Sequence, residues 1–158
     1  MPLVPSEVLL IGIATLGVTL AGFAGVVAVF REDDTWTEMH SFRLRVLVRN
    51  SLAVMFMALL PLIFMTGFGD ERVAIGVASS SSAAWMLLTV IQLQRQWLRI
   101  SKFVVPANIT STGMAVLAML LFAWNAAALD RAWPYVTALC LVLLTAALAF
   151  QRMIGLRR

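Results

Sequence analysis

The chain has 158 residues, the length of one ordinary domain, but 61% of them are hydrophobic and only 13% are charged. A soluble domain is about half apolar and about a quarter charged, so this chain lacks the polar side chains that would cover an apolar surface in water. Together with a mean hydropathy of +0.92, this excludes an ordinary soluble domain. The net charge of +4 does not indicate nucleic-acid binding, because the basic residues stand at the ends of apolar runs and form no patch.

Five long runs without a charged residue follow one another along the chain: 8–30, 50–69, 73–94, 103–129 and 132–151. Each is long enough to span a bilayer, since a helix needs about 20 residues to cross the hydrocarbon core. Only helices and closed barrels satisfy their backbone in lipid, and the runs show no alternation with a period of two. The sequence therefore predicts an all-α integral membrane bundle, one domain with five transmembrane helices at about 8–30, 46–67, 73–97, 106–128 and 133–152.

The basic residues predict which side of the membrane each loop faces. Of the twelve lysines and arginines, only Arg72 and Arg131 fall in the second and fourth connections. The other ten fall in the first and third connections and at the C-terminus. Because lysine and arginine collect on the cytoplasmic side, we expect the N-terminus outside and the C-terminus in the cytoplasm.

Small residues recur at four-residue spacing in the first predicted helix, at Gly17, Ala21 and Gly25. In a membrane this spacing lets two helix backbones approach closely. The face could join two copies of the chain or pack within one bundle, and packing within the bundle is the favoured interpretation. In either case we expect Gly25→Leu to disrupt assembly.

The connection to the second helix combines a helix start with a basic cluster. Thr35 and Glu38 have the spacing of a capping box, which predicts that a helix begins there. Topology determination and local ion pairing are sufficient to explain the basic residues on this side. A sharper interpretation is a contact with anionic lipids or with a cytoplasmic partner. Its residues are Arg43, Arg45, Arg49, Arg95, Arg99 and Lys102.

Pro61 interrupts the second predicted helix. It has no N–H to donate to the Met57 carbonyl, so we expect a kink at this point. Such kinks are more often part of the static shape of a helix than of a gate.

A polar stripe runs along the third predicted helix and has a possible partner in the fourth. It could line a hydrated path or a small-ligand pocket, but hydrogen bonds between helices explain it more simply. We expect Asn125 to lie at the same depth as the serines and to complete a pocket with them. The stripe and this partner comprise Ser79, Ser80, Ser81, Ser82, Trp85, Thr89, Gln92, Gln96 and Asn125.

Aromatic residues and a single thiol mark the remaining helices. The residues expected at the membrane interfaces are Trp36, Trp97, Trp124, Trp133 and Tyr135. Cys140 is the one cysteine of the chain and lies in an apolar run, so we expect a buried, inert thiol and no disulfide within the chain.

The sequence contains no group of residues that is typical of a particular enzymatic reaction. It has no Ser/His/Asp set, no paired histidines and no phosphate-binding loop, so we expect no cofactor, no metal and no enzymatic activity. Carboxylates or histidines at membrane depth usually mark proton relays. Because none lies deep in a predicted helix, an ion-coupled transporter is not expected.

Several short stretches resemble a family of small, uncharacterised bacterial membrane proteins. They cover most of the chain and comprise residues 21–27, 42–45, 59–61, 124–126, 133–135 and 150–152. The resemblance implies a five-span bundle in the bacterial inner membrane. It implies no activity.

Besides a membrane-embedded enzyme, the least favoured hypothesis because the sequence has no catalytic constellation, two functional hypotheses remain. The first is a homo-oligomeric, channel-like protein through which small solutes or ions pass. One chain has too few helices to enclose a wide lumen, so this hypothesis requires several copies. The second is an accessory or scaffold subunit of a larger membrane complex. In both, the lipid bilayer is the surrounding medium.

Overall fold

The computed structural model describes residues 5–29, 38–100, 106–129 and 131–154. Its helices are α1 (Pro5–Val29), α2 (Glu38–Phe68), α3 (Glu71–Ile100), α4 (Pro106–Trp124), the short π-helix η2 (Asn125–Leu129) and α5 (Ala132–Ile154). The five α-helices are each long and apolar enough to cross a membrane. The predicted all-α fold with five such helices is therefore confirmed. Thr35 of the predicted capping box lies outside the described residues.

A tight turn joins α2 to α3. Gly69 has a φ of 69°, a conformation that favours glycine, and its N–H donates to the Met65 carbonyl at 3.0 Å. The Asp70 side chain then accepts the N–H of Arg72 at 2.9 Å, which caps the first turn of α3. This turn makes α2 and α3 an antiparallel pair.

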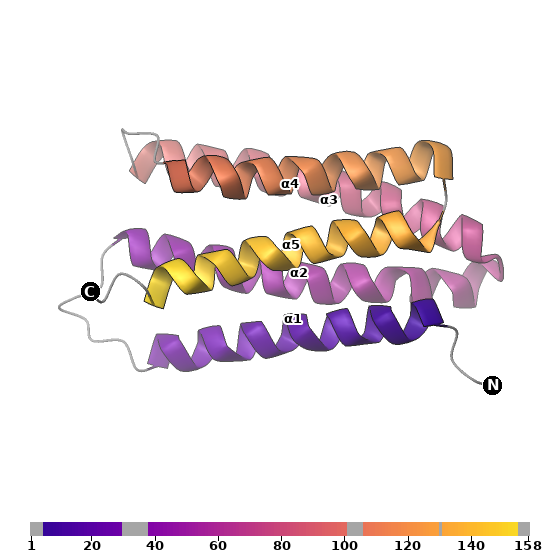
Figure 1. Cartoon of the computed structure of the whole chain (residues 1–158), viewed down its shortest axis with the longest axis horizontal. Coiled ribbons are helices and arrows are strands. Elements are labelled where there is room, and N and C mark those ends of the chain that lie inside the picture. The colour runs from indigo at the N-terminus through magenta and orange to yellow at the C-terminus, as the bar shows by residue number, and fades with distance from the viewer. Residues whose placement is uncertain (1–4, 30–37, 101–105, 130, 155–158) are drawn as a thin grey trace.

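Helix α2 is the central element of the bundle, because it contacts α1, α3 and α5. Helix α4 packs on α3 and α5, so α1 and α4 lie at opposite edges (Figure 1). The two termini lie at opposite ends of the bundle. We call the end at which α2 begins and α5 ends the basic end, because Arg43, Arg45, Arg95 and Arg152 lie there.

The core consists of two clusters of buried apolar side chains. The larger includes Val54, Phe122, Tyr135 and Leu139, and the rings of Phe122 and Tyr135 meet edge to face at 5.2 Å. The smaller, toward the basic end, contains alanines of α1 and α5 packed around Leu47. Small side chains let the helices approach closely there.

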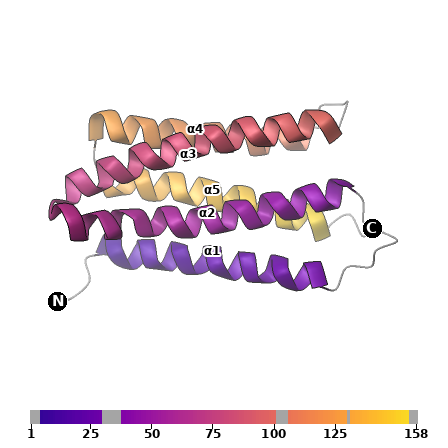
Figure 2. The same ribbon diagram turned by 180° about the vertical axis from the view of Figure 1, so that it is seen from behind.

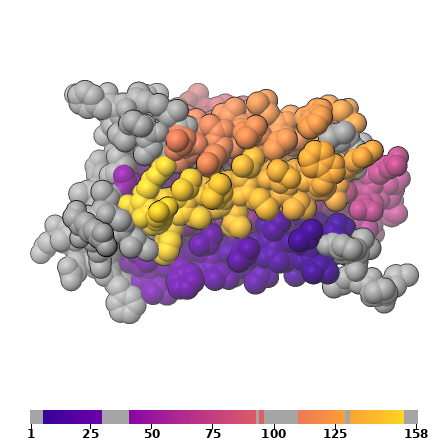
Figure 3. Space-filling model, in the orientation of Figure 1, coloured from indigo at the N-terminus to yellow at the C-terminus, as the bar shows by residue number. Residues whose placement is uncertain are grey.

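Large apolar side chains also cover the outside of the bundle. Each α-helix exposes some of them, for example Leu16, Phe56, Leu88, Leu120 and Leu144. The space-filling view shows α4, α5 and α1 forming one continuous face (Figure 3). An apolar surface of this extent is stable only against lipid, so the chain is a multi-pass membrane protein.

Candidate functional site

The four consecutive serines of α3 divide between the interior and the surface of the bundle. Ser79 and Ser82 are fully buried, whereas Ser80 and Ser81 are exposed. The exposed hydroxyls donate to backbone carbonyls one turn earlier in α3, at 2.9 Å for Ser80 and 3.0 Å for Ser81. A helix turns by about 100° per residue, so only part of the run can face neighbouring helices.

Asn125, the first residue of η2, joins α3 to the beginning of α5. Its side chain is fully buried. Its Nδ2 donates to the Ser79 hydroxyl at 2.9 Å, and its Oδ1 accepts the N–H of Arg131 at 3.1 Å. The structure thus brings Asn125 and Ser79 together, and both ends of the buried amide have a partner.

Tyr135 of α5 supplies the hydrogen bond that Pro61 removes from α2. Its hydroxyl donates to the Met57 carbonyl at 2.5 Å, the oxygen that a residue other than proline at position 61 would bond. The hydroxyls of Tyr135 and Ser82 are 3.1 Å apart. Because the single Tyr135 proton goes to a carbonyl, Ser82 must be the donor in this second bond.

This position for Tyr135 corrects the expectation that the residue belongs to an interfacial aromatic belt. Its side chain is only 1% exposed, whereas Trp124 and Trp133 are 50% and 56% exposed. Trp36 and the side chain of Trp97 are outside the described part of the structure. The sequence does contain a feature that could have predicted this position. Pro61 leaves the Met57 carbonyl without a partner in its helix, and Tyr135 lies at a depth from which its hydroxyl can reach that carbonyl.

Arg49 of α2 contacts polar residues in the half of α3 that is nearer the basic end. Its Nη2 donates to the Gln92 side-chain oxygen at 2.7 Å and to the Thr89 hydroxyl at 3.3 Å. The guanidinium lies over the ring of Trp85, 5.5 Å from its centroid, in a cation–π contact. Arg49 therefore joins three members of the predicted stripe, while the side chain of Gln96 lies outside the described residues.

Helices α2 and α5 share a polar contact that the sequence analysis did not single out. Asn50 donates from Nδ2 to the Thr145 hydroxyl at 3.0 Å, and Thr145 donates to the Val142 carbonyl at 2.7 Å. Both side chains are buried. Neither residue belongs to a polar run, so no pattern in the sequence marks the pair.

Among the described arginines of the predicted basic cluster, Arg43 is directed away from the others. Arg43 is directed toward α5, where its Nη1 donates to the Arg152 carbonyl at 3.4 Å. Arg45 and Arg95 are exposed, on α2 and α3. The side chain of Arg99 and the whole of Lys102 lie outside the described residues.

The three small residues of the predicted packing face lie in different surroundings. Gly17 is pressed against α2, because a Cβ there would lie 2.7 Å from the Ser51 carbonyl oxygen. Ala21 is half-buried, and Gly25 is exposed. A Cβ at Gly25 would meet nothing within 4 Å among the described residues. Packing within the bundle thus explains Gly17, whereas no contact among the described residues explains Gly25.

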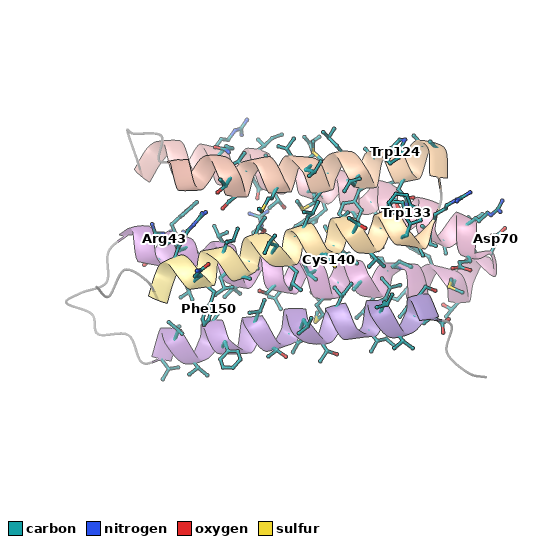
Figure 4. All side chains as sticks on the ribbon, in the orientation of Figure 1. Arg43, Asp70, Trp124, Trp133, Cys140 and Phe150 are labelled. Atoms are coloured by element: carbon teal, nitrogen blue, oxygen red, sulfur yellow. The ribbon has the colours of Figure 1, made fainter. Side chains whose placement is uncertain are left out.

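Cys140 differs from the sequence expectation, since its side chain is exposed. It lies midway along α5 on the face seen in Figure 4, between Trp133 and Phe150. The apolar run around it was compatible with burial in protein or in lipid, and the rotation of α5 directs it outward.

A mostly apolar hollow lies at the end opposite the basic end. Pro61, Ile75 and the ring of Tyr135 form part of its wall, and Glu7 and Glu71 also line it. The hydroxyl of Tyr135 is already bonded to Met57 and Ser82. Among the described side chains, no three of His, Cys, Asp or Glu lie close enough together to hold a metal ion.

No known protein family, no curated protein and no solved structure matches the chain. The resemblance to small bacterial membrane proteins is confirmed only in its architecture. The chain has five long apolar helices, as a polytopic membrane protein does.

Proposed function

We propose that this chain is a non-catalytic membrane protein that acts as a homo-oligomer and lets small solutes or ions cross the membrane between its copies. The observation that carries the proposal is one exposed face of α1, formed by Gly12, Thr15, Thr19 and Gly22. We call this surface the Gly12–Gly22 face.

The Gly12–Gly22 face has the features of a helix contact that its own bundle does not use. A Cβ at Gly12 or Gly22 would meet nothing within 4 Å of the described structure, in contrast to Gly17. Thr15 and Thr19 donate to carbonyls of their own helix, each at 2.9 Å, so the face presents no unbonded donor. Small residues at helical spacing favour close approach of a second transmembrane helix, particularly when their hydroxyls are already bonded within their own helix.

The placement of the polar side chains supports a path between copies instead of one through a single chain. Ser79, Ser82 and Asn125 are buried and hydrogen-bonded to other protein groups. These bonds hold helices together within the bundle. Ser80 and Ser81 are the serines of this run that reach the surface, where a neighbouring copy could share them.

The membrane and its orientation belong to the same proposal. The arginines of the basic end favour the cytoplasmic side for that end, which places the N-terminus outside. The resemblance described above favours the bacterial inner membrane.

Native mass spectrometry of the full chain in lipid nanodiscs tests the assembly. We expect a discrete homo-oligomer of three or more copies, and we expect Gly22→Leu to shift it to monomer because the side chain separates the facing helices. Ala123→Leu, which also introduces a leucine but at an exposed alanine of α4, should keep the oligomer. A monomeric natural chain would contradict the proposal.

The accessory-subunit hypothesis remains the second candidate, because the Gly12–Gly22 face could equally receive a helix of a different protein. Flux from liposomes distinguishes the two. In a channel, Ser80→Leu changes the flux of small solutes while the oligomer survives. In an accessory subunit, the natural chain gives no flux above empty liposomes and a second protein copurifies with it.

A further inference from the structure

Arg49 brings a positive charge into the bundle, and its partners among the described side chains carry no negative charge. Its partners are Thr89, Gln92 and the ring of Trp85, and all three are neutral. Both protein bonds come from Nη2. The guanidinium carries five N–H groups, and those on Nε and Nη1 have no partner among the described residues.

Two more arginines flank Arg49 on the same side of the α2–α3 pair. On α2, Arg45 precedes Arg49 by one helical turn. On α3, Arg95 follows Gln92 by three residues. Each of these two arginines therefore lies on the face of its helix that makes the Arg49–Gln92 bond. Because α2 and α3 are antiparallel and Arg49 is level with Thr89 and Gln92, Arg45 is level with Arg95. Both side chains are exposed.

Of the four carboxylates in the described ranges, Glu38 begins α2 at the basic end, and the other three lie far from this group of arginines. Glu7 lies near the start of α1, and Asp70 and Glu71 lie at the turn between α2 and α3. All three are therefore at the end of the bundle away from Arg45, Arg49 and Arg95. Positive charge at the edge of a low-dielectric medium is costly unless an anion accompanies it.

The surface next to these arginines is apolar. Going away from the basic end, α2 exposes Leu52 and Phe56, at 39% and 62%, and α3 exposes Leu88 at 59%. Leu52 and Phe56 follow Arg45 and Arg49 along one face of α2, and Leu88 lies one turn from Gln92 on α3. Figure 2 shows α2 and α3 side by side at the front and separating toward the basic end.

We propose that the surface formed by α2 and α3 at the basic end binds an anionic phospholipid. Arg49, held in place by Gln92, Thr89 and Trp85, binds the lipid phosphate together with Arg45 and Arg95. The acyl chains lie along Leu52, Phe56 and Leu88. Along the bundle axis, charged side chains are followed by apolar ones, as the headgroup of a phospholipid is followed by its acyl chains. A free anion would need no apolar surface. The site lies within one chain and does not depend on the proposed oligomer.

Lipid titration with native mass spectrometry tests the site. The full chain in detergent is mixed with phosphatidylglycerol, with phosphatidylcholine of the same acyl chains, or with inorganic phosphate alone. We expect phosphatidylglycerol to bind most tightly and inorganic phosphate not to compete with it. Arg49→Gln should weaken phosphatidylglycerol binding about fivefold to tenfold.

The control is Arg131→Gln, which removes an exposed arginine at the other end of the bundle and should leave lipid binding unchanged. If Arg49→Gln proves unstable, the pair Arg45→Gln and Arg95→Gln removes two exposed charges and should weaken binding similarly. Equal binding of both lipids by the natural chain would overturn the proposal. So would unchanged phosphatidylglycerol binding in a folded Arg49→Gln variant, or its displacement by inorganic phosphate.

Discussion

The hydroxyl of Tyr135 lies where the ring of Pro61 has removed a backbone donor from α2. In water, the Met57 carbonyl could bond to solvent, but in lipid an unsatisfied carbonyl costs several kcal/mol. The Tyr135 hydroxyl satisfies it, and Ser82 donates to Tyr135 in turn. A proline in a membrane helix thus specifies which side chain of another helix must lie beside it.

We predict that Tyr135→Phe lowers the free energy of unfolding by about 1–2 kcal/mol, because the Met57 carbonyl loses its donor. In a Pro61→Ala background the loss should be smaller, since the N–H of an alanine can make the helical bond. Unfolding by denaturant in mixed micelles measures both. An equal loss in the two backgrounds would contradict this assignment.

The matched control for Tyr135→Phe is Thr137→Val in the same helix. Thr137 is exposed and donates only to the Trp133 carbonyl of its own helix at 2.9 Å. Its removal leaves no group of another helix without a partner, so we expect little change in stability.

Between elements, Gly17 is the point at which α1 closely approaches the backbone of α2. A Cβ at this position would lie 2.7 Å from the Ser51 carbonyl oxygen and 3.2 Å from the Met55 nitrogen. Both atoms belong to the backbone, so they cannot move aside as a flexible side chain could. The distance between α1 and α2 is therefore set by the absence of a side chain at one residue.

We predict that Gly17→Ala destabilises the bundle by about 1–3 kcal/mol, because it forces α1 away from α2. Gly113→Ala in α4 is the control. A Cβ at Gly113 meets nothing within 4 Å of the described structure, and alanine favours helix over glycine by about 1 kcal/mol. Thermal unfolding should show opposite shifts in Tm, and equal shifts would contradict the close contact.

Across the whole molecule, charge and polarity are distributed along the axis of the bundle. Arg43, Arg45, Arg95 and Arg152 lie at the basic end, whereas Glu7, Asp70 and Glu71 lie at the other end. The middle carries apolar side chains outward. This distribution is that of a protein held across a bilayer in one orientation.

We predict that reporter fusions in bacteria detect this orientation. Alkaline phosphatase, which is active only outside the cytoplasm, should be inactive when fused after residue 158 and active when fused after residue 70. A green fluorescent protein fused at residue 158 should fluoresce. The reverse pattern at both positions would show that the N-terminus faces the cytoplasm.

The sequence by itself determined the architecture of this protein. The number of helices follows from the uncharged runs, because the length of an apolar segment is a local property and a backbone in lipid has no alternative to the helix. The candidate polar residues could also be named from the sequence, including Asn125 near the serines. The sequence did not specify which of these residues would meet.

Only the tertiary structure decided the partners, because they depend on how each helix is rotated about its axis. That rotation buries Ser79 and Ser82 and exposes their neighbours Ser80 and Ser81. It also turns Tyr135 inward to Met57 and Cys140 outward. In a chain that is apolar on all sides, hydrophobicity does not distinguish the face toward lipid from the face toward protein, so packing and hydrogen bonds between helices make that choice.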